Sequence, residues 1–166
     1  MSIEFVPVTA AGQVEELCAL AREIWEEHFT PIIGAGQVEY MLEKFQSVPA
    51  VSEQLEQGYR YFLFQEEGKT VGYTGVQKQE EKLFLSKLYI HKKSRGKKYA
   101  SCAIRFLCGL CREEGLPSIW LTVNRHNEHT IAIYKKLGFS ITRTQVTDIG
   151  GGFVMDDYIM EKPVEA

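Results

Sequence analysis

The stretch Lys87–Ala100, KLYIHKKSRGKKYA, decides the fold that we predict for this chain. An apolar strand runs there into a short basic loop, Arg95–Lys98, and a long helix that ends near Glu114 begins directly afterwards. The first turn of a helix has unpaired backbone N–H groups and the positive end of the helix dipole. The loop therefore indicates a site for phosphate oxygens, although an ordinary solvated loop can carry the same charge.

The segment Asn127–Phe139, NEHTIAIYKKLGF, is a second motif and predicts a helix that carries Tyr134. Asparagine is among the best residues for capping a helix N-terminus, and Gly138 followed by Phe139 is typical of a helix stop with its hydrophobic contact. Together the two motifs indicate a cofactor that carries a pyrophosphate, with a proton donor beside it.

Apolar periodicity and turn residues predict the remaining elements. We expect strands at residues 3–8, 59–65, 70–78, 82–91, 118–124, 139–146 and 153–160, and helices at residues 11–29, 38–45, 51–57 and 98–114, besides the helix of the second motif. Pro31 should interrupt the first helix. Strands 82–91 and 118–124 flank a helix, and such a βαβ unit makes them parallel. The predicted fold is a single α/β domain, residues 1–166, with a mixed sheet that is parallel in its centre and antiparallel at its flanks.

Composition excludes several classes of protein. A chain of 166 residues that is 45% hydrophobic and 25% charged is sized for one globular domain with a real core. The net charge of -3 and the pI near 5.9 argue against a nucleic-acid binder. No apolar run approaches the roughly 18 residues that span a bilayer, and the start of the chain lacks the basic residues of a secretory signal. We therefore expect a cytoplasmic protein that binds neither membrane nor nucleic acid.

Three of the four cysteines, Cys102, Cys108 and Cys111, fall in the helix after the basic loop. Cys108 and Cys111 match the C-x-x-C spacing, but no second pair and no histidine at ligand spacing accompany them. We expect buried, reduced thiols and no metal site.

The order of elements and the two motifs resemble the GNAT superfamily of N-acetyltransferases, most strongly from Leu83 to Phe139. The family carries a motif of the form [QR]-x-x-G-x-[GA], of which Arg95 matches the first position and Ala100 the last. Lys98 stands where the family usually has glycine. If the loop needs a positive φ there, lysine costs about 1 kcal/mol, whereas a helical φ costs nothing.

The resemblance implies that acetyl-CoA is the acyl donor and that its pantetheine arm pairs with the first parallel strand by strand addition. The cofactor-binding residues that it implies are Leu88, Tyr89, Ile90, Arg95, Gly96, Lys97, Lys98, Tyr99, Ala100, Ser101 and Asn127. The alternation of apolar residues in this strand suggests a bulge near Ser86 and Lys87, although an ordinary strand with irregular alternation fits as well.

The resemblance also assigns Tyr134 as the proton donor to the leaving thiolate, because a phenol stays protonated at neutral pH. A tyrosine that merely packs under the sheet is the alternative. Many relatives place a glutamate on the strand before the loop as the general base, but this strand offers only Ser86 and Lys87. The remaining candidates for a base are His28, His91, Glu26, Glu27 and Asp156. An amine that arrives neutral needs no side-chain base, and His28 also fits as a hydrogen-bonded core residue.

The acceptor should be framed by the first helices and the last hairpin. The candidate acceptor-binding residues there are Trp25, His28, Phe29, Tyr40, Asp156 and Asp157. Aromatic rings with carboxylates suit a cationic amine, although the acidic pair also fits a plain solvated strand. We therefore expect a small-molecule amine or a peptide as acceptor, and the last hairpin offers an edge strand for a homodimer.

Two functions remain open at this stage. The first is an acetyl-CoA-dependent N-acetyltransferase in which the amine attacks the thioester directly. The second is a non-catalytic module of the same fold that binds acyl-CoA and regulates. Tyr134 favours the enzyme, whereas the missing strand glutamate and Lys98 favour the module. A nucleotide phosphotransferase is disfavoured because the chain lacks the G-x-x-x-x-G-K-[ST] motif.

Overall fold

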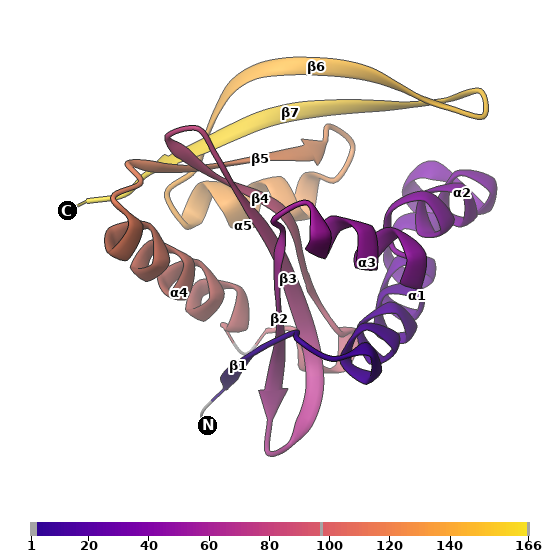
Figure 1. Ribbon diagram of the computed structural model, residues 1–166. Coiled ribbons are helices and arrows are strands. Elements are labelled where there is room, and N and C mark those ends of the chain that lie inside the picture. The colour runs from indigo at the N-terminus through magenta and orange to yellow at the C-terminus, as the bar shows by residue number, and fades with distance from the viewer. Residues whose placement is uncertain (1–2, 97, 166) are drawn as a thin grey trace. The chain divides into compact units, whose positions relative to one another are not determined.

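The computed structural model describes residues 3–96 and 98–165, which form seven strands, five α-helices and one short 3₁₀ helix (Figure 1). In chain order they are β1 (Glu4–Pro7), α1 (Ala11–Ile33), α2 (Ala35–Phe45), α3 (Val48–Glu56), β2 (Arg60–Glu66), β3 (Lys69–Gln79), β4 (Lys82–Ile90), η1 (Lys92–Ser94), α4 (Tyr99–Glu114), β5 (Ser118–Asn124), α5 (Glu128–Lys136), β6 (Ser140–Gly150) and β7 (Phe153–Pro163).

The strands form one sheet in the order β1-β2-β3-β4-β5-β7-β6. Strands β4 and β5 are parallel, whereas the pairs β1–β2, β2–β3, β5–β7 and β6–β7 are antiparallel. The predicted α/β fold with a parallel centre and antiparallel flanks is therefore confirmed.

The chain divides into two compact units, and strand β4 contributes to both. The first unit consists of Met1–Gln77 and Lys87–Ala100, and the second of Lys78–Ser86 and Ser101–Ala166. The amino-terminal half of β4 therefore belongs with β5, while its carboxyl-terminal half belongs with β2, β3 and the first three helices.

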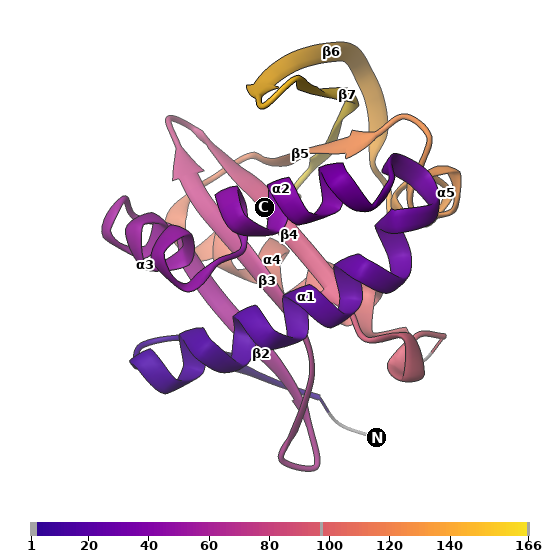
Figure 2. The same ribbon diagram turned by 90° about the vertical axis from the view of Figure 1, so that its right-hand side faces the viewer.

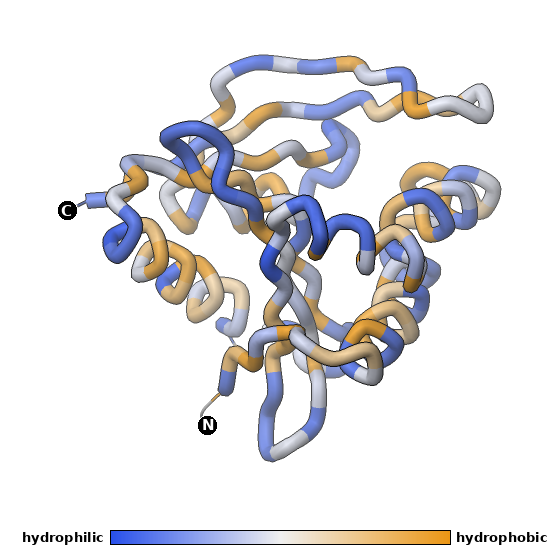
Figure 3. Tube along the Cα trace, viewed as in Figure 1, coloured by the Kyte–Doolittle hydropathy of each residue, from blue (hydrophilic) through white to orange (hydrophobic). Residues whose placement is uncertain are grey.

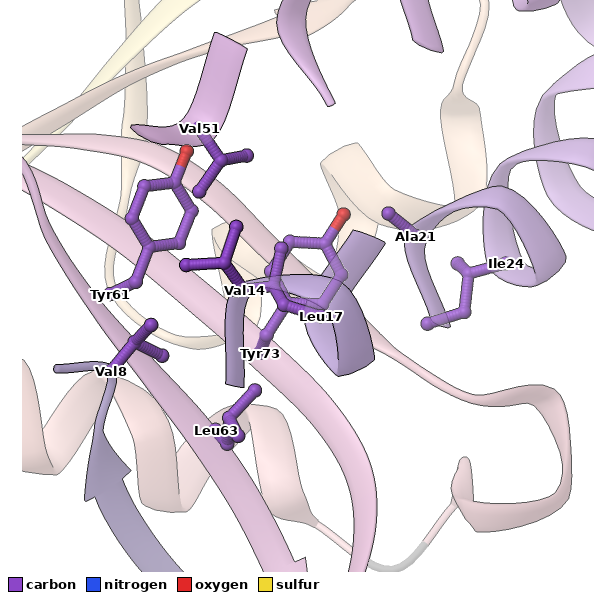
Figure 4. Close-up of a cluster of buried hydrophobic side chains, with 9 residues drawn as sticks. All are labelled: Val8, Val14, Leu17, Ala21, Ile24, Val51, Tyr61, Leu63 and Tyr73. Atoms are coloured by element: carbon purple, nitrogen blue, oxygen red, sulfur yellow. The ribbon is translucent and has the colours of Figure 1, made fainter. Parts of the chain in front are cut away.

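In the first unit, helices α1, α2 and α3 cover one face of strands β2 and β3 (Figures 1 and 2). The apolar stripe of α1 is buried as its spacing predicts, and it meets α3, β2 and β3 in one cluster (Figure 4). The cluster consists of Val8, Val14, Leu17, Ala21, Ile24, Val51, Tyr61, Leu63 and Tyr73. Full burial of one aliphatic side chain of this size stabilises a fold by about 1.5–3 kcal/mol.

Helix α1 is longer than we predicted, because it continues through Pro31 to Ile33. Pro31 has no N–H and so removes one hydrogen bond of the helix, but only two residues of α1 follow it. The helix ends instead at Gly34, whose N–H donates to the carbonyl of Thr30 at 2.9 Å.

In the second unit, β5 pairs with β4 over Leu83–Leu85 and with β7 along its whole length. Helix α5 lies beneath β5 in Figure 1. Figure 3 colours most of α4 hydrophobic, up to its charged carboxyl end. No helix in the described residues has both the length and the apolar character that a membrane crossing needs.

Helix α5 ends as its sequence predicts. The N–H of Phe139 donates to the carbonyl of Tyr134 at 3.0 Å, and that of Gly138 donates to Lys135 at 3.1 Å. This pair of bonds requires a left-handed residue after the helix, and Gly138 supplies it with φ of 100°. The rings of Tyr134 and Phe139 then pack edge to face, with centroids 5.3 Å apart.

The last hairpin is longer than we predicted, since β6 runs to Gly150 and β7 to Pro163. Strand β5 pairs with β7 only from Asp157 onward, so the segment Phe153–Asp156 pairs with β6 alone. This end of the hairpin is a two-stranded ribbon (Figure 1). It exposes Val146 and Val154, and a homodimer formed through the β6 edge stays a prediction.

Gly72 provides a test of how closely β3 and β4 approach in the first unit. A Cβ at this position would lie 2.5 Å from the carbonyl oxygen of Tyr89. We expect Gly72→Ala to lower the free energy of unfolding by about 1–3 kcal/mol, measured by urea denaturation. Gly109 is the matched control, because a Cβ in the middle of α4 would meet nothing within 4 Å and alanine should raise stability by about 0.5–1 kcal/mol. Equal stability of the two variants would contradict the close approach.

Candidate functional site

The connection between β4 and α4 is a folded turn rather than an open loop. It begins where the N–H of His91 donates to the carbonyl of Val71 at 2.7 Å, which holds the end of β4 against β3. The imidazole Nδ1 of His91 then accepts from the N–H of Lys93 at 3.1 Å, and the N–H of Ser94 donates back to His91 at 2.8 Å. The turn delivers the chain to the first residue of α4, Tyr99.

Two residues of this turn have left-handed backbone conformations. Gly96 has φ of 82° and Lys98 has φ of 63°. The position at which relatives usually carry glycine therefore does adopt a positive φ, and lysine there costs about 1 kcal/mol. The chain accepts this strain directly before the free amides of a helix, as strain is often accepted at ligand-binding turns. Lys97 lies outside the described residues.

The side chain of Arg95 is already occupied by protein groups. Its guanidinium binds both carboxylate oxygens of Glu27 at 3.1 and 3.2 Å, and its Nε donates to the carbonyl of Ile90 at 3.1 Å. Partial burial is the largest single influence and raises the pKa of Glu27, but the hydrogen bond and the charge of Arg95 together with nearby positive groups outweigh it, and the net shift is downward. Arg95 thus ties the turn to helix α1, so any phosphate contact of this loop falls mainly to the backbone amides.

His91 forms the second link between this turn and α1. Its Nε2 lies 2.7 Å from Oε1 of Glu23, one helical turn before Glu27. The pKa of Glu23 is lowered mainly by its hydrogen bond to His91. One ion pair, Arg95 with Glu27, and one hydrogen bond, His91 with Glu23, thus fix one face of α1 against the turn that precedes α4.

Lys87 is the residue whose role the sequence did not reveal. Its side chain is only 5% exposed, on the same strand as the predicted pantetheine-binding residues. The Nζ atom donates to the carbonyl of Phe45 at 2.6 Å, to Oε1 of Gln54 at 2.9 Å and to the hydroxyl of Tyr61 at 2.5 Å. The hydroxyl of Thr74 donates to the main-chain carbonyl of Lys87 at 2.6 Å. These bonds join β4 to α2, α3, β2 and β3.

All three acceptors of the Lys87 ammonium are neutral oxygen atoms. Burial lowers the pKa of Lys87 to about 7, and the nearby Cys18 only partly opposes this shift. The thiol of Cys18 stays protonated, because burial raises its pKa to about 11. A buried cation that is hydrogen-bonded but has no counter-ion is expensive, and its three hydrogen bonds offset the cost only in part.

Several of the predicted acceptor residues gather around Tyr89 on the first unit. Its ring lies 5.6 Å from that of Trp25 and 6.0 Å from that of Phe29, while Trp25 and Phe29 are 4.2 Å apart. His28 packs edge to face on Phe29 at 4.8 Å. The structure therefore brings three predicted residues together with Tyr89. Tyr40, on α2, has the ammonium of Lys44 5.7 Å from its ring.

Tyr134 and Asn127 both lie on α5 of the second unit and are both buried. Burial raises the pKa of Tyr134 well above its usual value, so the phenol stays protonated at every physiological pH. Asn127 occupies the N-cap position, but its side chain makes no capping hydrogen bond, and this prediction was wrong. Instead the carbonyl of Asn127 accepts from the N–H of Ile131 at 3.0 Å, which begins the helix without the side chain.

The acidic pair on β7 consists of two residues in different environments. Asp156 binds Arg125 at 2.8 Å, and Arg125 also lies 5.4 Å from the ring of Tyr158. Asp157 is 4% exposed, which contradicts the reading of a solvated strand. Burial raises the pKa of Asp157 to about 6, and the charge of Asp156 adds to the shift. In the sheet register Asp157 stands opposite Asn124, the last residue of β5.

These features fit a known class of enzyme, in which a strand–turn–helix holds an acyl carrier. The chain belongs to the acetyltransferase (GNAT) family, whose model matches residues 17–139. As a member of this family, the protein is an acetyltransferase that takes its acyl group from acetyl-CoA. Members of the family act on amine or peptide acceptors. A comparison with curated protein sequences finds no match.

Similar solved structures cover nearly the whole chain at low identity. The PaiA N-acetyltransferase of Thermoplasma acidophilum, in complex with coenzyme A, is 23% identical over 98% of this chain and 99% of its own, with a TM-score of 0.80. The ribosomal-protein-S18-alanine N-acetyltransferase of Escherichia coli is 16% identical over 99% and 96%, with a TM-score of 0.71. A chimera of the spermidine N-acetyltransferase SpeG from Vibrio cholerae with hSSAT is 15% identical over 98% and 96%, also with a TM-score of 0.71. At these identities the likeness establishes the fold.

Lys87 should make the stability of the protein depend on pH. Its pKa is about 7 in the folded chain and near its ordinary value of 10.5 in the unfolded chain. Between these values the unfolded chain binds more protons, so the free energy of unfolding should rise with pH from 7 to 9, by at most about 1.4 kcal/mol per pH unit. The contribution of Cys18, which has the opposite sign, begins only near pH 9.

We expect Lys87→Met to remove this rise, measured by urea denaturation at pH 7, 8 and 9 in the presence of a reductant. Lys136→Met is the matched control, because Lys136 is exposed on α5 and its removal should leave the slope unchanged. A wild-type stability that does not change over this range would contradict the downward shift of the pKa.

The ion pair between Glu27 and Arg95 should hold the turn ready for acetyl-CoA. We expect Glu27→Gln to raise the Kd for acetyl-CoA about 3–10-fold, measured by calorimetry, because the turn loses one of its two links to α1. Arg95→Gln should weaken binding similarly, and the double variant should be little worse than either. Glu26→Gln serves as the control, because Glu26 binds Arg22 instead. Tighter binding by Glu27→Gln would instead show that Arg95 is held back from the phosphates.

Proposed function

We propose that this chain transfers the acetyl group of acetyl-CoA to an amine that attacks the thioester directly, with Tyr134 protonating the leaving thiolate. The observation that carries the proposal is the strained turn at Gly96 and Lys98, which leads into the first turn of α4 in a chain of this family. Unpaired amides at a helix start suit a diphosphate, and a left-handed residue directly before them lets the backbone approach the ligand.

In this proposal, backbone groups of the protein make most of the contacts with acetyl-CoA. The amides of Gly96 and of Lys98–Ser101 bind the diphosphate, and the backbone of Leu88–Ile90 pairs with the pantetheine arm as an added strand would. Asn127, which is buried at the start of α5, contacts the arm in this proposal, as the family resemblance implies. Arg95 and Glu27 orient the turn.

Tyr134 suits the task of a proton donor for two reasons. Its raised pKa keeps the phenol protonated at neutral pH, so the hydroxyl carries a proton when the carbon–sulfur bond breaks. Its ring is also held by Phe139 and by the helix stop at Gly138, so that the hydroxyl keeps a fixed direction. An acid that is held in place in this way costs little reorganisation when the carbon–sulfur bond breaks.

The acceptor in this proposal is an aliphatic amine or the amino terminus of a peptide. In the first unit, Trp25, Phe29 and Tyr89 offer an aromatic surface, with His28 beside Phe29. In the second unit, the candidates are the acidic residues Asp156 and Asp157, and both kinds of side chain suit a cationic amine. Similar structures act on spermidine and on an alanine of a ribosomal protein, which supports both kinds of acceptor. Tyr40 is a further candidate on α2 of the first unit. A cytoplasmic location agrees with such acceptors.

A non-catalytic module that binds acyl-CoA is the second candidate. Lys87 favours it, because this buried, hydrogen-bonded lysine lies on the strand where many relatives carry the glutamate that accepts a proton. The two candidates predict different behaviour of the same variant.

Tyr134→Phe distinguishes the enzyme from the module. We expect wild-type protein to release thiol from acetyl-CoA in the presence of at least one of spermidine, kanamycin, glycine and an alanine-led peptide. Tyr134→Phe should lower kcat about 10²-fold or more and leave the Kd for acetyl-CoA nearly unchanged, because only the proton donor is lost. Tyr59→Phe, at the residue before β2, is the matched control. A wild-type protein that binds acetyl-CoA but releases no thiol with any of these amines would favour the module.

A further inference from the structure

The side-chain candidates for the general base are mostly committed to other groups. Among the described residues, four candidates are each bound to a partner of opposite type, and such a contact occupies the side chain. The contacts are Glu26 with Arg22, Glu27 with Arg95, His91 with Glu23, and Asp156 with Arg125. His28 packs on Phe29. A carboxylate that is not bound to a cation is the better base for an amine.

Asp157 is such a carboxylate. Asp157 is 4% exposed. Within the part of the chain that the structure describes, it forms no ion pair with an arginine, lysine or histidine. The charged groups nearest to it along the sheet are Asp156, which repels it, and Arg125, which is bound to Asp156 at 2.8 Å. Its neighbours across the sheet, Asn124 on β5 and Gln145 on β6, are neutral. The end of β5 therefore holds one carboxylate without a counter-ion.

A buried carboxylate without a counter-ion destabilises the folded chain. Burial and the charge of Asp156 raise the pKa of Asp157 to about 6, so the group is still ionised at neutral pH against the preference of its surroundings. A charge that the fold holds at a cost to its own stability is a common mark of a functional site. A cationic amine would supply the missing partner, and a base with a pKa near 6 suits a reaction at neutral pH.

We propose that Asp157 binds the acceptor amine and accepts its proton, which makes the acceptor a cationic, aliphatic primary amine. This inference rests on the proposed function. Asp157 first pairs with the ammonium and takes one proton, and the amine nitrogen then forms a bond to the thioester carbon. The tetrahedral intermediate loses its second amine proton to solvent and breaks its carbon–sulfur bond, and the thiolate takes the proton of Tyr134. Asp157 passes its own proton to water, and Tyr134 is reprotonated by water, so the protons balance over one turnover.

The test compares Asp157→Asn with wild type, using whichever of spermidine, kanamycin and an alanine-led peptide gives the highest wild-type turnover. We expect the variant to lose about 10²-fold in kcat/KM for the amine, with the Kd for acetyl-CoA unchanged within twofold. The wild-type profile of kcat/KM against pH should rise along a limb with an apparent pKa near 6, and the variant should lack that limb.

A second measurement separates a catalytic role from a structural one. Removing an uncompensated buried charge should raise the Tm of Asp157→Asn above that of wild type at pH 7.5, so activity and stability should change in opposite directions. Asp148→Asn is the matched control on the same hairpin, where the carboxylate only accepts from the N–H of Gly150 at 2.8 Å. It should match wild type in both measurements.

Three outcomes would overturn the inference. Full turnover by Asp157→Asn would exclude Asp157 as the base while leaving the proposed function intact. Reduced turnover with a lowered Tm and an unchanged pH limb would assign Asp157 a structural role. A wild-type protein that turns over none of the amines would overturn the proposed function, and this inference with it.

Discussion

The buried ammonium of Lys87 is the constraint on which the first unit depends. One side chain joins the end of α2, the side of α3 and strand β2 to strand β4, and the hydroxyl of Thr74 fixes the main chain of the same residue from β3. Because an ammonium cannot be left unsatisfied in an apolar interior, these elements must stay together. The segment that we assign to the pantetheine arm, Leu88–Ile90, follows Lys87 directly on β4, so the same hydrogen bonds fix its position.

Charge is used differently in the two units. In the first unit, Arg95 and His91 are paired with Glu27 and Glu23, which leaves the backbone amides of the turn as the groups available to a diphosphate. In the second unit, Arg125 is paired with Asp156 and leaves Asp157 without a cation. Paired side chains therefore hold the framework, while we assign the proposed ligand contacts to main-chain dipoles in the first unit and to one unpaired carboxylate in the second.

Local sequence patterns predicted most of the fold because they depend on neighbouring residues alone. The alternation and turn chemistry gave the strand order of the parallel centre, and Gly138 with Phe139 gave the end of α5. The errors have equally local causes. Pro31 was predicted to interrupt the helix although α1 continues for two residues beyond it, and Asn127 was predicted to cap α5 with its side chain although its carbonyl begins the helix.

The sequence by itself determined the family, the cofactor and the turn before α4, because these depend on residue types at fixed spacing along one stretch of chain. Only the tertiary structure decided that Lys98 takes a left-handed φ, that Lys87 is buried, and that Asp157 differs from Asp156 beside it. The physical reason is that the energy of a charge depends on burial and on partners far away in sequence. Asp156 and Asp157 are identical residues in the sequence, and they differ only because the fold places Arg125 beside Asp156.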